Sequence, residues 1–147
     1  MPEKAARTIL AFDFGLQRIG VAVGEPELGT AHPLPGIAAR TQPGRLTAVE
    51  RLVKEWKPSL LVVGRPLGDD GAPHEMTRRA ERFARQLTGR FRLPVTLVDE
   101  RYSSAEVESR MRAAYGSRKA AALARGKALD SHAAQVILEQ YFGDKTS

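Results

Sequence analysis

Residues 8–23 read TILAFDFGLQRIGVAV, and this stretch decides which fold we expect. Its first and last five residues are short apolar runs, and a tight segment of small and polar residues lies between them. Two such runs so close together predict an antiparallel β-hairpin. The first run ends in Asp13, so a carboxylate is expected at one end of the sheet.

Downstream of the hairpin, strand-like and helical patterns alternate. We expect a third, weaker strand near residues 33–38 and two buried strands at residues 60–63 and 94–98, the last two because their apolar runs are continuous. Apolar residues at helical spacing or capping signals predict helices over residues 43–56, 74–88, 103–114 and 127–142. This order predicts an α/β fold, in which a strand meander and then parallel strands form a mixed sheet flanked by helices.

Length and composition favour one globular domain. The 147 residues predict a single domain over residues 1–147, with its core at about residues 8–142. The absence of cysteine excludes disulfides, thiolate zinc sites and a cysteine nucleophile. No apolar run approaches the roughly 20 residues of a membrane span, and the N-terminus lacks the apolar region of a signal peptide. We therefore expect no membrane contact and a cytoplasmic protein.

The charge is strongly basic. Lys plus Arg minus Asp plus Glu is 23 − 17 = +6, which suggests a polyanionic partner, with nucleic acid as the first candidate. Two runs concentrate this charge: residues 78–92 hold six arginines and one acid, and residues 110–127 hold six basic residues and no acid. Each run alone fits an ordinary solvated surface; together, beside an acidic site, they favour a track for phosphates.

Three acids stand at the ends of expected elements. Asp13 and Glu100 follow strands, and Asp130 opens the segment of residues 130–138 near the start of the last helix. Each has a purely structural interpretation: a turn in which the glycine of Asp13-Phe14-Gly15 takes positive φ, an ion pair of the strand end with Arg101, and a helix N-cap. Because neighbouring strand residues face opposite ways, Asp99 and Glu100 need not share a site. Together the three acids predict a two-metal Mg²⁺ or Mn²⁺ site for phosphodiester cleavage, its ions about 3.5–4 Å apart.

The blocks that carry these acids resemble the YqgF family, also called RuvX, whose members are known as pre-16S rRNA nucleases or Holliday junction resolvases. The resemblance spans about residues 8–142, with every block in order. The matching blocks are Asp13-Phe14-Gly15, residues 18–23 (RIGVAV), residues 62–67 (VVGRPL), residues 99–104 (DERYSS), and Lys127 with Asp130, Ala133-Ala134 and Ile137-Leu138.

The resemblance implies an RNase H-like fold with a five-stranded mixed sheet, and metal-dependent nuclease chemistry that matures the 5′ end of small-subunit ribosomal RNA. It implies that the catalytic and metal-binding acids are Asp13, Glu100 and Asp130. Contacts with the substrate are implied for Arg18, Gly64, Arg101, Ser103 and Lys127. Many related sequences have a further acid where this chain has Ser131. That departure suggests one tightly held ion and a second recruited with substrate.

The function we expect is a nuclease acting on structured RNA, most of all precursor ribosomal RNA. One alternative is resolution of four-way DNA junctions, which needs a dimer because two symmetric cuts need two sites. No dimerisation stripe is evident in the sequence, so a monomer is favoured. A second alternative is a non-catalytic RNA-binding module. A third, an actin-like ATPase, is disfavoured because such enzymes enclose ATP between two domains of this kind.

Overall fold

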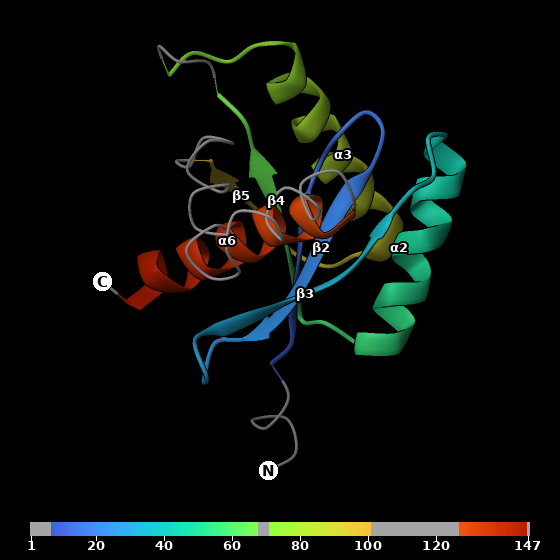
Figure 1. The fold of residues 1–147 in the computed structure, drawn as a ribbon. Helices are drawn as coiled ribbons and strands as arrows, with labels where there is room; N and C mark the ends of the chain where they lie inside the picture. The colour runs from blue at the N-terminus through green and yellow to red at the C-terminus, as the bar shows by residue number, and fades with distance from the viewer. Residues whose placement is uncertain (1–6, 68–70, 101–126, 147) are drawn as a thin grey trace, which may run out of the picture.

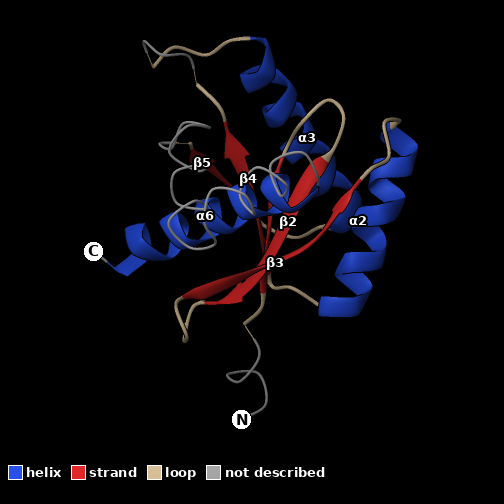
Figure 2. Cartoon of the chain, viewed as in Figure 1, coloured by secondary structure: helices blue, strands red, loops and turns tan. Residues whose placement is uncertain are grey.

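The computed structural model describes residues 7–67, 71–100 and 127–146, with side chains in the last helix from residue 131 to residue 144. These residues form one five-stranded sheet with the strand order β3-β2-β1-β4-β5 (Figures 1 and 2). The strands are β1 (Ile9–Asp13), β2 (Ile19–Glu25), β3 (Thr30–Ile37), β4 (Leu60–Arg65) and β5 (Val95–Asp99). The helices are α2 (Gln42–Trp56), α3 (Glu75–Phe91) and α6 (Lys127–Thr146).

The sheet is mixed, as the sequence predicts. Strand β2 is antiparallel to both β1 and β3, whereas β4 is parallel to both β1 and β5. The carboxyl ends of β1, β4 and β5 therefore meet at one edge of the sheet, where sites form in α/β folds. The predicted helix at residues 103–114 lies outside the described residues.

Strand β3 begins earlier than the sequence suggests, at Thr30 instead of near residue 33. A tight turn joins it to β2: Gly29 takes a positive φ of 68°, and its N–H donates to the carbonyl of Glu25 at 3.0 Å. Two prolines, Pro33 and Pro35, make the strand signal weak, because proline cannot donate to a ladder. Strand β3 is at the edge of the sheet, where such residues are tolerated.

Strict alternation along the strands gives the sheet two apolar faces. Leu10 and Phe12 of β1 face the helices α2 and α3, which cover one side. Ile9 and Ala11 face α6, which covers the other side (Figure 1). Both faces are buried because helices lie on each, and the continuous apolar runs of β1 and β4 follow from this arrangement. None of the described helices is both long enough and apolar enough to cross a membrane.

Candidate functional site

Strand alternation brings Asp13, Gly64 and Glu100 to the same face of the sheet. Ile9 and Ala11 pack toward α6, so Asp13, two residues further on, points the same way. Val62 and Val98 also pack toward α6, which puts Gly64 and Glu100 on that face as well. Phe12 pairs with Val63, and Gly64 pairs with Val98, so all three residues lie at neighbouring strand ends.

The carboxyl groups of Asp13 and Glu100 form a hydrogen bond with each other. Burial raises the pKa of the Glu100 carboxyl, and the bond to Asp13 partly offsets that shift. Two carboxyls share such a bond only while one holds a proton. With both ionised, the pair presents the hard carboxylate oxygens that a divalent cation prefers as ligands.

Gly64 provides the space in which Glu100 lies. A Cβ at this position would be 3.2 Å from Glu100 Oε2 and 2.4 Å from Ile137 Cδ1 of α6. Only a residue without a side chain lets both groups approach β4 so closely. The structure thus gives Gly64 a role in packing around Glu100.

Asp99 faces the opposite side of the sheet from Glu100, as alternation predicts. Its carboxylate accepts a 2.6 Å bond from Arg65 Nε, and Arg65 Nη1 also donates to Glu81 of α3 at 3.0 Å. The partner of the strand-end acid is therefore Arg65, and Arg101 lies outside the described residues. The backbone N–H of Glu100 donates to the Arg65 carbonyl at 3.0 Å, so Arg65 holds the β5 end through both its main chain and its side chain.

Helix α6 crosses the face on which Asp13 and Glu100 lie. Asp130 is the fourth residue of this helix, which begins at Lys127, so the N-cap interpretation of Asp130 is wrong. The helix begins at the start of the predicted range 127–142, so Asp130 lies within its first turn. The next residue, Ser131, is buried, and its hydroxyl donates to the Leu34 carbonyl of β3 at 2.5 Å. The side chains of Lys127 and Asp130 lie outside the described part of the chain, as do Arg101 and Ser103.

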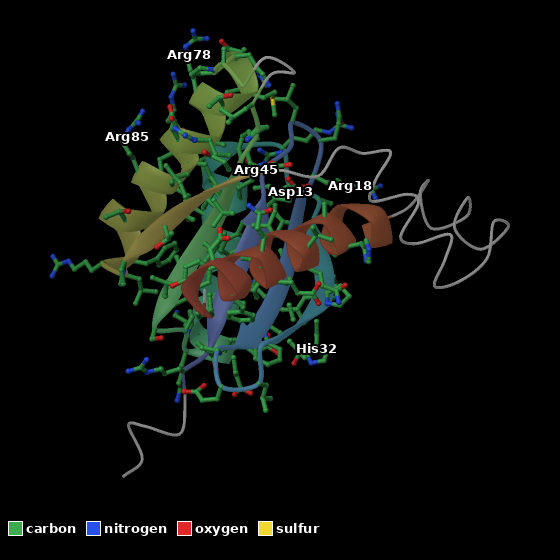
Figure 3. The ribbon with its side chains drawn as sticks, turned by 90° about the vertical axis from the view of Figure 1, so that its left-hand side faces the viewer. Asp13, Arg18, His32, Arg45, Arg78 and Arg85 are labelled. Atoms are coloured by element: carbon green, nitrogen blue, oxygen red, sulfur yellow. The ribbon has the colours of Figure 1, made fainter. Side chains whose placement is uncertain are left out.

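The loop between β1 and β2 is tight because the chain folds back closely on itself at Gly15. Gly15 does not take positive φ; among the described glycines only Gly29 and Gly71 do. Gly15 is needed because a Cβ there would lie 2.5 Å from the carbonyl oxygen of Arg18. Arg18 sits at the same end of the sheet as Asp13 in Figure 3.

Sequence reasoning missed Arg45, which ties this loop to α2. Its side chain is buried, and it donates from Nη2 to the Leu16 carbonyl and from Nε to the Ala39 carbonyl, both at 2.7 Å. The signal was its place on the inner face of α2, four residues before Val49. A charged residue at such a position requires polar partners inside the fold.

Among the described side chains, no three possible metal ligands come together. Asp13 and Glu100 are in contact, and α6 carries Asp130 across the same face, with a side chain that is not described. The site is thus a pair of acids at the carboxyl ends of β1 and β5.

A family model described as "RuvX: Holliday junction resolvase" matches residues 7–144, nearly the whole chain. The chain belongs to the RuvX family. Relatives with the name "Putative pre-16S rRNA nuclease" include one from Paraburkholderia phytofirmans, 50% identical over 141 residues that cover 96% of this chain and 91% of the relative. Another, from Paraburkholderia xenovorans, is 51% identical over 91% of this chain and 86% of its own.

Solved structures place this RuvX chain among the RuvC-like resolvase folds. Thermus thermophilus RuvC, in complex with a Holliday junction substrate, superposes with a TM-score of 0.57 at 17% identity and covers 96% of each chain. The fowlpox virus resolvase, with its substrate Holliday junction DNA, gives 0.59 at 13% identity, over 95% of this chain and 99% of its own. The predicted RNase H-like fold is confirmed.

Proposed function

We propose that this chain is a divalent-metal-dependent nuclease that trims the 5′ end of pre-16S ribosomal RNA in the cytoplasm. The observation that carries the proposal is the bond between Asp13 and Glu100 at the carboxyl ends of two strands. Two half-buried acids are seldom held in contact without a proton or a cation to share. The names of the relatives at about half identity support the substrate.

The residues fit a divalent cation. Asp13, Glu100 and Asp130 would hold it, because carboxylate oxygens are the ligands that Mg²⁺ and Mn²⁺ prefer. A bound ion of this kind supplies a nucleophilic water at neutral pH and stabilises the leaving oxygen of a phosphodiester. Since residue 131 is a serine whose hydroxyl bonds the Leu34 carbonyl, we expect one ion in the free protein and a second only with substrate.

The excess of basic over acidic residues favours binding of the nucleic-acid backbone. We assign contacts with backbone phosphates to Arg18, Arg101, Ser103 and Lys127. Near Gly64, which has no side chain, we expect the substrate to approach the sheet closely. Residues 1–147 would act as a single nuclease domain, and a monomer suffices for cleavage of one RNA strand.

The test is cleavage of a pre-16S fragment by the wild type and by Asp13→Asn, with Mg²⁺, Mn²⁺ or EDTA. Glu50→Gln is the matched control, because it removes a surface carboxylate that pairs with Lys54 and with Arg90. We expect cleavage by the wild type and the control only with metal. Cleavage at the wild-type rate by Asp13→Asn would refute the assignment.

A second candidate is resolution of four-way DNA junctions, favoured by the description of the RuvX family. Its chemistry would be the same, but two symmetric cuts require two copies of the site. A four-way junction included in the same assay, with sedimentation to measure the oligomeric state, separates the two functions. Paired symmetric cuts by a dimer would favour the junction over the RNA.

A further inference from the structure

A basic pocket lies beside the candidate site, on the α2 and α3 side of the sheet. It has a volume of about 160 Å³ and no acidic residue in its lining. Phe14, the residue after Asp13, forms part of its wall together with Phe83 of α3. Four arginines also line it: Arg40, Arg45, Arg79 and Arg82.

Arg45 is the unusual member of this group, because it is 6% exposed and has no carboxylate partner among the described residues. Two of its N–H groups bond the carbonyls of Leu16 and Ala39, and its guanidinium lies 5.2 Å from the centre of the Phe14 ring. Its remaining N–H groups bond no described residue. Buried charges in proteins are normally paired, so this arrangement lacks an anion.

The other three arginines add positive charge around the mouth of the pocket. Only Arg79 has an acidic partner among the described side chains, Glu75 at 3.0 Å, in an exposed pair one helical turn away. Arg40 and Arg82 are exposed and form no ion pair with a described residue. Several guanidinium groups around one small space match the oxygens of a phosphate, which accept forked bonds.

We propose that this pocket binds a backbone phosphate of the nucleic-acid strand, outside the acidic site and on the α2/α3 side of the β1 end. The proposal rests on the proposed function, because it assumes that nucleic acid lies across Asp13. Phe14 links the two places directly: its neighbour Asp13 faces α6, whereas Phe14 packs toward α3. A strand across the carboxyl end of β1 would therefore meet the pocket next.

The size of the pocket favours a phosphate group over a whole small molecule. Sites for cofactors and drug-sized ligands have volumes of about 300–1,000 Å³. A pocket of about 160 Å³ is smaller than that range, but it has room for one phosphate and a few waters. It also opens to solvent between exposed arginines, so a continuing chain can enter and leave it.

The test measures binding in EDTA, where cleavage is absent, with a fluorescent pre-16S fragment over a series of salt concentrations. The pocket variant carries Arg40→Gln and Arg82→Gln. The matched control carries Arg51→Gln and Lys54→Gln, which remove two exposed cations of α2 that lie outside the pocket and outside residues 78–92. Each phosphate contact that is lost reduces the magnitude of the slope of log association constant against log salt by about one. We expect the pocket variant to have a less steep salt dependence, with the magnitude of the slope smaller by about two, and the control to change little.

Equal slopes for the two double variants would overturn the proposal, because the arginines would then act only through net charge. A second arm adds inorganic phosphate or adenosine monophosphate and follows the melting temperature. Stabilisation by either that is lost in the pocket variant, with unchanged RNA binding, would assign the pocket to a small phosphate ligand and also overturn the proposal. The binding result does not depend on cleavage, so failure of the pocket and failure of the nuclease are told apart.

Discussion

Asp13 and Glu100 form a hydrogen bond across the end of β4, the strand that separates β1 from β5. Strand β4 carries a glycine, Gly64, beside the Glu100 carboxylate, where a Cβ would come within 3.2 Å of Glu100 Oε2. Three neighbouring strands thus bring two carboxyl groups together and leave space for one of them. This relationship is the basis of most of the predictions below.

Asp13→Asn should stabilise the metal-free protein, because it removes one of two acids held in contact with each other. We expect a gain of about 1 kcal/mol, or roughly 2–4 °C in melting temperature for a domain of this size. With Mg²⁺ the order should reverse, since only the wild type binds the ion tightly. Thermal unfolding in EDTA and in Mg²⁺ measures both effects. Equal stabilisation of the two proteins by Mg²⁺ would contradict the metal assignment.

Glu100→Gln should change how the stability of the metal-free protein depends on pH. Burial raises the pKa of Glu100 in the folded state, so the folded protein holds that proton more tightly than the unfolded chain does. The stabilisation by the protonated form is complete below about pH 4.3, the usual value for glutamate, and is lost as the pH rises through the raised pKa. The wild type should therefore lose stability relative to Glu100→Gln over this range. Denaturant unfolding of both proteins between pH 4 and 8 measures the difference, and parallel curves would show that burial does not shift this group.

Gly64→Ala should impair cleavage more than its effect on stability explains. The new Cβ would meet Ile137 and press on the Glu100 carboxylate, at a cost of about 1–3 kcal/mol. The control is Gly89→Ala in α3, where a Cβ meets nothing within 4 Å and should stabilise the helix by up to about 1 kcal/mol. Cleavage rates per folded molecule, with unfolding curves, make the comparison. Unchanged cleavage by folded Gly64→Ala would mean that the position of Glu100 is not critical.

Arg65→Met should lower cleavage with only a small loss of stability. Its ion pairs with Asp99 and Glu81 are partly exposed, so they contribute less than about 1 kcal/mol. Their role is to hold the end of β5, from which Glu100 extends. Arg90→Met breaks a comparable surface pair with Glu50 far from the acids and should leave cleavage unchanged. Titration of Mg²⁺ against both variants should show weaker metal binding for Arg65→Met alone; equal affinities would remove Arg65 from the site.

Ser131→Asp should destabilise the protein, although it would add the further acid that the family resemblance implies at this position. The Ser131 hydroxyl is buried and donates to the Leu34 carbonyl, whereas a carboxylate cannot donate and would place two acceptors in contact. We expect a loss of about 2–3 kcal/mol, against about 1 kcal/mol for Ser131→Ala. Urea unfolding of both variants tests this order. A Ser131→Asp protein as stable as the wild type would show that α6 can turn this residue toward the metal site.

The sequence predicted the strands, the mixed sheet and the two acids, Asp13 and Glu100, that are in contact. Alternation along β1 and β5 is a local property, so it alone indicated that Asp99 and Glu100 face opposite sides of the sheet. It placed the start of β3 too late, near residue 33 instead of at Thr30, and it erred at Asp130, where a good capping residue lies inside the helix. Both errors arise because residue preferences are weak compared with long-range packing.

Some features of the site depend on pairs of residues that are distant in the chain. Arg65 finds Asp99 and Glu81 only when β4, β5 and α3 are assembled. The basic pocket combines the start of α2, the middle of α3 and the loop after β1. Neither could be predicted, because the local pattern shows at most that Arg45 lies on the inner face of α2 and does not show which residues these arginines meet.

By itself, the sequence determined which residues face which side of each strand and that acids end two of them, because side-chain direction follows from backbone geometry over a few residues. Only the tertiary structure decided that β4 lies between β1 and β5, that Gly64 leaves space for Glu100, and that Arg45 is buried with no acidic partner among the described residues. Strand order and burial are set by the packing of the whole chain, and the distance between two carboxyl groups depends on both.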